Sequence, residues 1–349
     1  MNKTDKFYTS GVTRAVLLTF LCLAFVLSLC LPLFACGAEF ASSAQAACVV
    51  ERNSGRVLYA KNAEMPLPMA STTKIATALT VLRLVHDLDK VVTISAEACG
   101  IEGSSVYLVE GEQLTVRDLL HGLMLRSGND CAVQLALYAS GSVDGFVDEM
   151  NKTAKSLGCN ETHFVTPHGL HDEKHFTTAC DLAVITCAAL NNDAFAQIVA
   201  CKKYRCSASG SRVFLNKNKL LAAYPYADGV KTGYTKAAGR CFVGSATKDG
   251  MSVVCVLLNC PPMFEDCQRL CDSAFANYAM KQIVPRGKMC GSIVDKNGQR
   301  SFYCLKEGFC YPVKPCEKVT TQVELDGNAQ TMSVFVDEKQ VACLPLSRV

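Results

Sequence analysis

The sequence lacks a strong charge imbalance. Its 35 lysine and arginine residues are matched by 32 aspartate and glutamate residues, and the formal net charge is +3. The chain also has no long basic or acidic block, no internal repeat and no low-complexity tract. This balance argues against nucleic acid and against a strongly anionic molecule as partners. The 349 residues, half of them hydrophobic, are enough to bury a sizeable core and to form two domains.

Patterns typical of metal sites are scarce as well. No pair of C-x-x-C motifs suggests zinc. His168, His171 and His175 form H-x-x-H-x-x-x-H, but Pro167 and Gly169 predict a loop there rather than one helix face. We therefore expect these histidines to shape a loop, and we expect neither a metal nor an organic cofactor.

Cysteine, by contrast, is abundant, with 21 residues. They are scattered through helix-like and strand-like segments instead of following the spacing of a disulfide framework. Many occupy places where alanine, valine or serine would serve, such as Cys131 and Cys255. The sequence favours free cysteine used as a small hydrophobic residue, and it leaves room for one or two disulfides.

The N-terminus predicts a targeting segment. Lys3, Lys6 and Arg14 precede a mostly apolar run from Ala15 to about Ala38, and Ala44-Gln45-Ala46 resembles a cleavage signal. The run is long for a signal peptide and almost long enough to span a bilayer. Residues 1–46 are thus either a signal peptide or a retained N-terminal membrane anchor, and both place the rest of the chain outside the cytoplasm.

The remaining pattern predicts strands at both ends of a region whose middle is helical. Residues 48–58 form a strand, a turn at Gly55 and a second strand. Helices are expected over 71–85, 114–125, 131–138, 143–157, 178–190 and 264–282, and strands over 229–235, 241–247 and 252–258. The sequence therefore predicts an antiparallel sheet covered by helices, with strands from both ends of the region in one sheet.

A domain boundary is predicted at Pro285-Arg286-Gly287. Beyond it the sequence alternates in short, turn-punctuated segments, for example Val319–Leu325, Ser333–Val336 and Val341–Leu346. We expect one domain over residues 47–284 and a small β-rich C-terminal domain over residues 285–349.

The first motif with chemical meaning is Ser71-Thr72-Thr73-Lys74. On a helix, residues i and i+3 lie on one face, so the Lys74 amine can take the proton of the Ser71 hydroxyl. This requires a neutral lysine, and burial or a second cation lowers the pKa of the amine. The same spacing recurs at Ser245 and Lys248, but on a predicted strand they point to opposite faces. Taken alone, Ser71 also fits an ordinary helix N-cap.

Two further motifs follow in order. Ser127-Gly128-Asn129, the only S-x-N in the chain, falls in a predicted break between helices, where a hydroxyl can relay a proton. Lys231-Thr232-Gly233, the only K-T-G, lies on a predicted strand and offers a cation, a hydroxyl and room for a ligand backbone. Each is compatible with a simple turn or strand. Each of the three motifs, however, lies on the kind of element that its chemistry requires. Their combination therefore favours a catalytic set.

With these motifs the sequence resembles the D-alanyl-D-alanine carboxypeptidases of the low-molecular-mass penicillin-binding protein family, peptidase family S11. The resemblance runs from about residue 48 to about residue 278. It is carried by Ala70-Ser71-Thr72-Thr73-Lys74, Gly103-Ser104-Ser105, Leu125-Arg126-Ser127-Gly128-Asn129-Asp130, Pro167-His168-Gly169-Leu170 and Asp228-Gly229-Val230-Lys231-Thr232-Gly233-Tyr234-Thr235. It implies the serine β-lactamase-like fold, an α/β (α+β) arrangement.

The resemblance also implies an activity and roles for the motif residues. The enzyme would remove the terminal D-Ala from peptidoglycan stem pentapeptides, with Ser71 as nucleophile, Lys74 as general base and Ser127 as proton relay. The oxyanion would lie between the N–H groups of Ser71 and Tyr234. The residues expected to bind substrate are Asn129, Lys231, Thr232, Gly233 and Tyr234.

Partners and location follow from the same resemblance. We expect peptidoglycan stem peptides as substrates, β-lactams as covalent inhibitors, no nucleic acid, and membrane association only through the N-terminal segment. The site of action would be the cell wall or the outer face of the cytoplasmic membrane of a bacterium. A DD-endopeptidase or a serine β-lactamase of the same fold remains an alternative, and a non-catalytic wall-binding role is disfavoured by the intact motifs.

One departure from the family pattern concerns the substrate carboxylate. Family members can carry an arginine a little after the strand that follows K-T-G, where it helps to bind this group. Here the region reads Met263-Phe264-Glu265-Asp266, with Arg269 further on. The sequence therefore leaves the additional carboxylate-binding residue open.

Overall fold

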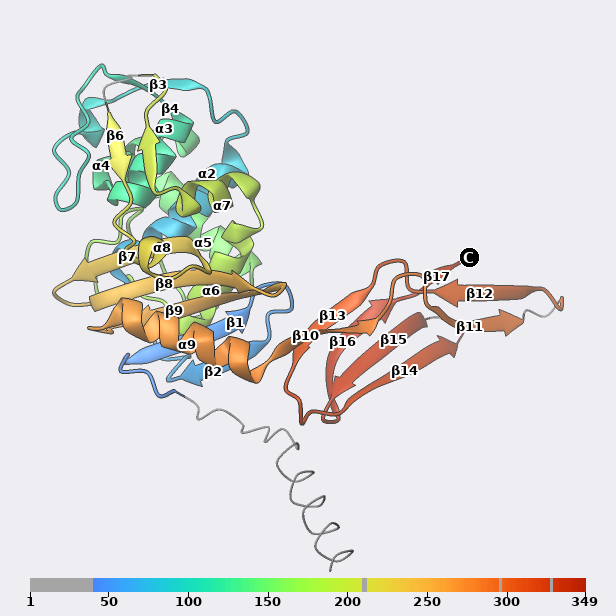
Figure 1. Ribbon diagram of the computed structural model, residues 1–349. Helices are drawn as coiled ribbons and strands as arrows, with labels where there is room; N and C mark the ends of the chain where they lie inside the picture. Colours follow the sequence, from blue (N-terminus) through green and yellow to red (C-terminus); the bar gives the residue numbers. More distant parts are fainter. Residues whose placement is uncertain (1–39, 209–211, 295–296, 327–328) are drawn as a thin grey trace, which may run out of the picture. The chain divides into compact units, whose positions relative to one another are not determined.

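The computed structural model describes residues 40–208, 212–294, 297–326 and 329–349 (Figure 1). Most of the predicted targeting segment, residues 1–46, lies outside these ranges. In the described part of the chain no single helix has both the length and the apolar character needed to cross a membrane. Among the described helices, one pair, α6 (Ala179–Leu190) and α7 (Asp193–Ala200), together reaches such a composition, and the pair is bent by 105°.

Five antiparallel strands form the central sheet, in the order β2, β1, β9, β8, β7. Their bounds are β1 Ala46–Glu51, β2 Val57–Lys61, β7 Ala227–Thr235, β8 Gly239–Lys248 and β9 Met251–Leu258. β1 pairs with β9 along its whole length, so the prediction that strands from both ends of this region share a sheet is confirmed. Asp249 and Gly250, both at positive φ, form the tight turn between β8 and β9, as is typical of a D-G dipeptide.

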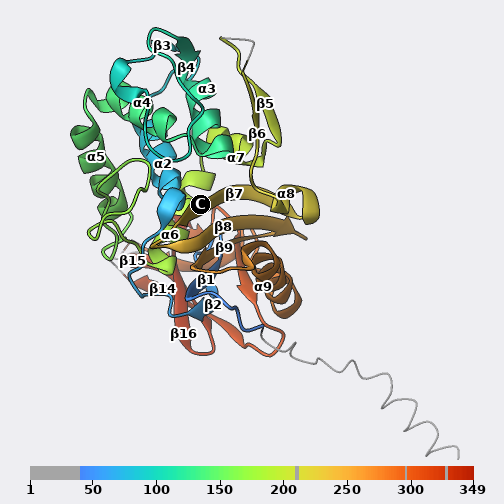
Figure 2. The ribbon, with the colours of Figure 1, turned by 90° about the vertical axis from the view of Figure 1, so that its left-hand side faces the viewer.

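Side chains that alternate along the buried strands enter two hydrophobic cores, one on each face of the sheet. Cys48 and Val50 of β1 join the larger core, whereas Val49 joins the smaller one. The helices that supply the larger core are α2 Lys74–Leu84, α3 Val116–His121, α4 Asn129–Ser140, α5 Val143–Ser156, α6 and α7. The smaller core packs against α8 (Leu220–Ala223) and α9 (Met263–Asn277), and Figure 2 shows α9 on the opposite side of the sheet from α2 and α5.

Cysteine side chains contribute to both cores. Every cysteine in the described ranges is free. Cys255, Cys267 and Cys271 are fully buried together in the smaller core, and the Sγ atoms of Cys48 and Cys180 lie 3.6 Å apart beside the larger one. The buried positions fit the interpretation of cysteine as a small hydrophobic residue.

Several helix ends differ from the prediction. The helix expected over 264–282 ends at Asn277, because the residues after it form β10 (Ala279–Val284) and pair with β13 (Phe309–Val313). The helix expected over 114–125 is divided into β4 (Gln113–Thr115), α3 and a π-helical turn, Gly122–Arg126. In both places, contacts with distant segments override the local helix propensity.

The C-terminal part is built from short strands, as the sequence indicates. Its other strands are β11 Met289–Val294, β12 Arg300–Cys304, β14 Val319–Asp326, β15 Ala329–Val336, β16 Lys339–Pro345 and β17 Ser347–Arg348. They form small antiparallel sheets with their own hydrophobic clusters. The predicted fold class, an antiparallel sheet covered by helices with a small β-rich C-terminal part, is confirmed. The boundary at residue 285 stays a prediction, and the pairing of β10 with β13 groups residues 279–284 with the later strands.

Two short pairs of antiparallel strands, which the sequence did not predict, belong to the helical part. β3 (Val91–Thr93) pairs with β4, and β5 (Lys203–Arg205) pairs with β6 (Val213–Leu215). Strands of three residues give no usable alternation, so they are found only through their partners. The β5–β6 hairpin matters for the site because the chain runs from it directly to Lys217.

Candidate active site

Ser71 lies in a tight turn at the point where α2 begins. Residues Ala70–Thr73 form a short 3-10 helix, and α2 continues from Lys74. The hydroxyl of Thr73 donates to the carbonyl of Ala70 at 2.7 Å and braces this turn from within. The Nζ atom of Lys74 donates to Ser71 Oγ at 2.9 Å, which is the contact that the S-x-x-K spacing predicts.

Lys74 is completely buried, and its amine has three partners. Besides Ser71 Oγ, Nζ donates to Asn129 Oδ1 at 2.7 Å and to the carbonyl of His168 at 2.6 Å. Burial, and next the positive charge of Lys231, hold the pKa of Lys74 well below its ordinary value. A lysine in this setting can exist as a neutral amine, the form that accepts a proton from a hydroxyl.

Ser127 and Asn129 reach the same place from the break between α3 and α4. The π-helical turn ends at Arg126, and the next residue, Ser127, has a left-handed φ of +65°. Asn129 begins α4 and is held by two bonds: its Nδ2 donates to the carbonyl of Glu102 at 2.6 Å, and its Oδ1 accepts from Lys74. The Ser127 hydroxyl is buried and has no hydrogen-bond partner among the described residues, so it is available to a ligand.

The K-T-G motif lies on the edge strand β7, beside the Ser71 turn. Lys231 is buried, and its Nζ donates to the carbonyl of Thr232 at 2.7 Å. Burial, and next the charge of Lys217, lower the pKa of Lys231 to about 7. A Cβ at Gly233 would lie 3.1 Å from the backbone N of Ser71 and equally close to the carbonyl of Met69. Glycine therefore allows β7 to approach the turn that carries Ser71.

These residues surround an open cleft of about 360 Å³. The side chains that line it are Ser71, Ser104, Ser127, Lys217, Lys219, Thr232, Gly233, Tyr234, Arg240, Met263 and Phe264. The structure thus brings the residues of all three motifs together: Ser71, Ser127, Thr232, Gly233 and Tyr234 at the surface of the cleft, with Lys74, Asn129 and Lys231 buried behind it.

The loop before α6 packs against the turn that carries Ser71. One of its histidines, His175, was not assigned to the site from the sequence. His175 Nδ1 accepts from the backbone N–H of Val165 at 3.0 Å, so its Nε2 carries the proton toward Thr73 Oγ1, 2.8 Å away. Burial lowers the pKa of His175 to about 4. His175 therefore braces the turn of Ser71 as a neutral group, a role that only the folded loop reveals.

The three histidines of this loop do not converge on a common point. His168 contributes its carbonyl to Lys74 and accepts from Leu170 N with its ring, whereas His171 is exposed. In the described part of the chain no group of three histidine, cysteine or acidic residues is arranged to hold a metal ion. His168 and His175 instead make contacts within the loop and with the turn of Ser71.

The second S-x-x-K is engaged in ordinary structural contacts. Ser245 Oγ donates to Asp228, and the Lys248 amine lies 5.1 Å from the centre of the Tyr226 ring. The strand context that led us to discard this copy is correct, because Ser245 lies on β8.

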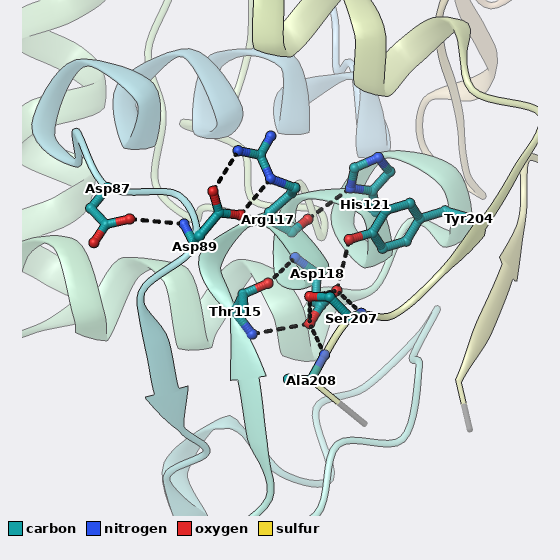
Figure 3. Close-up of polar contacts among 9 residues, drawn as sticks. All are labelled: Asp87, Asp89, Thr115, Arg117, Asp118, His121, Tyr204, Ser207 and Ala208. Atoms are coloured by element: carbon teal, nitrogen blue, oxygen red, sulfur yellow. Dashed lines mark hydrogen bonds and ion pairs between the residues drawn. The ribbon is translucent and has the colours of Figure 1, made fainter. Parts of the chain in front are cut away.

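The β5–β6 hairpin, which precedes Lys217, is fastened to α3 by a buried carboxylate (Figure 3). Asp118 accepts from Tyr204 Oη and from the backbone N–H of Ser207, both at 2.8 Å, and from Ala208 N at 3.2 Å. Burial acts to raise the pKa of Asp118, but the backbone hydrogen bonds from Ser207 and Thr115 outweigh it and lower the value. The His121 ring stacks on Tyr204 with 3.5 Å between the ring centres. The hairpin that precedes Lys217 is therefore held in place. The Nζ atom of Lys217 lies 3.4 Å from Ser104 Oγ.

Comparison with known proteins gives a consistent result. The model of the D-alanyl-D-alanine carboxypeptidase family matches residues 35–261. The D-alanyl-D-alanine carboxypeptidase DacF of Bacillus subtilis is 35% identical over 274 residues, which cover 76% of this chain and 70% of that protein. Penicillin binding protein 5 from Haemophilus influenzae matches with a TM-score of 0.76 and 28% identity, covering 89% of this chain and 97% of that chain. A mutant of the Streptomyces K15 DD-transpeptidase matches with a TM-score of 0.65 and 34% identity, covering 68% and 100%.

The fold and these relatives define a serine-type peptidase. More narrowly, the chain belongs to the D-alanyl-D-alanine carboxypeptidases, peptidase family S11, and the resemblance stated from the sequence is confirmed.

Proposed function

We propose that this enzyme removes the terminal D-Ala from peptidoglycan stem pentapeptides through an acyl-enzyme on Ser71. The observation that carries the proposal is the 2.9 Å contact between Lys74 Nζ and Ser71 Oγ, with the lysine fully buried. Membership in the carboxypeptidase family supports the same substrate class.

The reaction begins with proton transfer from Ser71 to the neutral amine of Lys74. Ser71 Oγ attacks the carbonyl carbon of the penultimate D-Ala, and the oxyanion forms between the backbone N–H groups of Ser71 and Tyr234. The proton passes through the Ser127 hydroxyl to the departing amine, so the peptide bond breaks and D-Ala leaves. Water then attacks the ester, which returns the proton to the Lys74–Ser71 pair and releases the shortened peptide.

The remaining motif residues position the substrate. Asn129 presents its amide beside Lys74, where it can orient a substrate peptide group. Lys231 supplies positive charge behind the cleft, and Thr232 presents a hydroxyl toward the terminal carboxylate. Gly233 and Tyr234 offer backbone groups along the edge of β7, where an extended peptide can pair with the strand.

Penicillin would enter by the same route. Its β-lactam carbonyl takes the place of the substrate amide, and Ser71 attacks it and breaks the C–N bond of the ring. The leaving amine stays attached to the acyl group and remains in the cleft, so the adduct is hydrolysed slowly. We place the activity outside the cytoplasm, at the cell wall or the outer face of the cytoplasmic membrane. The N-terminal segment would serve there as a signal peptide or as an anchor.

The test uses two serines that share the S-x-x-K spacing. Purified wild-type, Ser71→Ala and Ser245→Ala proteins are incubated with labelled penicillin and, separately, with a pentapeptide ending in D-Ala-D-Ala. We expect Ser71→Ala to lose both the covalent label and the release of D-Ala measured by mass, whereas Ser245→Ala retains both. Persistent labelling of Ser71→Ala would refute the assignment of the nucleophile, and penicillin turnover in milliseconds would favour a β-lactamase.

A further inference from the structure

The region after β9, for which the sequence left the additional carboxylate-binding residue open, brings no cation to the cleft. Met263 and Phe264 line the cleft with apolar side chains. Arg269, one to two turns further along α9, has its guanidinium 5.4 Å from the centre of the Phe40 ring. A different residue must therefore supply the cation if the substrate carboxylate is to be bound beside Thr232.

Arg240 lies on β8, next to the strand β7 that carries the K-T-G motif. Its side chain is on the same face of the sheet as those of Thr232 and Tyr234. In the register of β7 and β8, Arg240 is the direct partner of Tyr234. Tyr234 and Thr232 are two residues apart on one strand, so Thr232, Tyr234 and Arg240 share one face of the sheet. Diagonal neighbours of this kind are about 7–8 Å apart, which is within reach of an arginine side chain.

The cleft extends from Ser71 to Arg240. Both side chains line it, together with Thr232 and Tyr234. The backbone of Arg240 is fixed on two sides, since its carbonyl accepts from Cys260 N at 2.7 Å and its strand is paired to β7. The start of the arginine side chain is therefore set by the sheet, while its exposed end can adjust to a ligand.

The charge of the cleft points to an anionic group. In the described part of the chain, the charged side chains that line the cleft are Lys217, Lys219 and Arg240, and all three are basic. Lys217 already lies 3.4 Å from Ser104 Oγ. The Arg240 guanidinium has no hydrogen-bond or ion-pair partner among the described residues, whereas those of Arg117 and Arg212 are bound to Asp89 and Glu112.

We propose that Arg240 binds the free C-terminal carboxylate of the substrate, together with the Thr232 hydroxyl, and so selects peptides with a free carboxyl end. This inference rests on the proposed carboxypeptidase function and identifies the recognition group of the same site. A planar guanidinium can hold both oxygens of a carboxylate at once, which an amine cannot do. Arg240 would thus define which end of a peptide enters the cleft.

The experiment measures discrimination between two peptides that differ only at the carboxyl end. One acyl tripeptide ends in D-Ala-D-Ala with a free carboxylate, and its counterpart ends in the carboxamide. The value of kcat/KM is measured by the release of D-Ala or D-alaninamide for the wild type, Arg240→Gln, Arg240→Lys and Lys236→Gln. Lys236 is an exposed cation in the turn between β7 and β8 and does not line the cleft, so its variant controls for loss of charge alone.

We expect Arg240→Gln to lose about 10- to 100-fold on the carboxylate peptide, the loss typical of a charge-assisted hydrogen bond, and to change little on the carboxamide. Arg240→Lys should retain part of the preference, and Lys236→Gln all of it. Equal losses of Arg240→Gln on both peptides, or no loss on either, would overturn the proposal.

A failure of the proposed function gives a different result. In that case the wild type releases neither D-Ala from the carboxylate peptide nor D-alaninamide from the carboxamide. The role of Arg240 is then tested by comparing the acylation of Ser71 by benzylpenicillin and by its methyl ester. A preference for the free acid that is lost in Arg240→Gln supports the carboxylate site. An unchanged preference overturns it.

Discussion

The strongest quantitative consequence of the structure concerns His175 and acid. The imidazole is buried against the Ser71 turn and makes its two hydrogen bonds in the neutral form. Burial, and next the neighbouring His168, lower its pKa to about 4, against the ordinary value of 6.5. As the pH falls below 6.5, His175 becomes protonated in the unfolded chain but stays neutral in the folded chain. The folded state therefore loses stability as the pH falls from 6.5 toward 4.

The size of the effect follows from the two pKa values. A group that titrates at 6.5 when unfolded and at about 4 when folded lowers the free energy of unfolding by about 2.5 kcal/mol between pH 7.5 and pH 4.5. Other groups, His168 among them, add their own dependence. The contribution of His175 is therefore the difference between the wild type and a variant that cannot titrate at this position.

The assay is urea unfolding followed by circular dichroism at both pH values for the wild type, His175→Gln and His171→Gln. We expect His175→Gln to be less stable at both pH values but to lose about 2.5 kcal/mol less than the wild type on acidification. His171 is exposed in the same loop, so His171→Gln should keep the full wild-type loss. If His175→Gln and the wild type lose the same stability on acidification, the reasoning about a neutral, buried His175 is wrong.

Two further predictions concern the buried charges. Lys231→Gln removes a positive charge that lowers the pKa of Lys74, so the acid limb of penicillin acylation should move to higher pH; an unmoved limb in stopped-flow acylation would contradict this electrostatic link. Asp118→Ala leaves the N–H groups of Ser207 and Ala208 and the Tyr204 hydroxyl without their common acceptor, and it should cost about 1–3 kcal/mol in urea unfolding. It should also speed limited proteolysis in the β5–β6 hairpin, and unchanged cleavage there would show that the hairpin does not depend on this carboxylate.

The central sheet and the three motifs could be predicted because their signals are local. Ser71 and Lys74 meet within one helical turn. The two residues of the D-G turn are sufficient to indicate that β8 and β9 form a hairpin. Motif order then allowed Ser127 and Lys231 to be placed with Ser71, although they are far apart in the sequence. The resemblance to family S11 rests on this same order.

The rest of the site depends on contacts that no local pattern reports. His175 looks like one of several loop histidines until the folded chain places it 2.8 Å from Thr73. Arg240 looks like a solvated residue at the start of a strand, and only the register with Tyr234 brings it to the cleft. The end of α9 was misjudged for the same reason, because residues 279–284 become a strand only through β13.

The position of β1 in the sheet has a consequence for when this protein can fold. β1 lies between β2 and β9, and β9 ends at Leu258, so the sheet cannot close until some two hundred further residues have been synthesised. At ordinary rates of translation this interval is about 10 to 40 s. Pairing across such a separation is also intrinsically slow. A chain with this topology stays without its central sheet throughout most of its synthesis, the state in which a polypeptide can be threaded through a membrane before it folds on the other side.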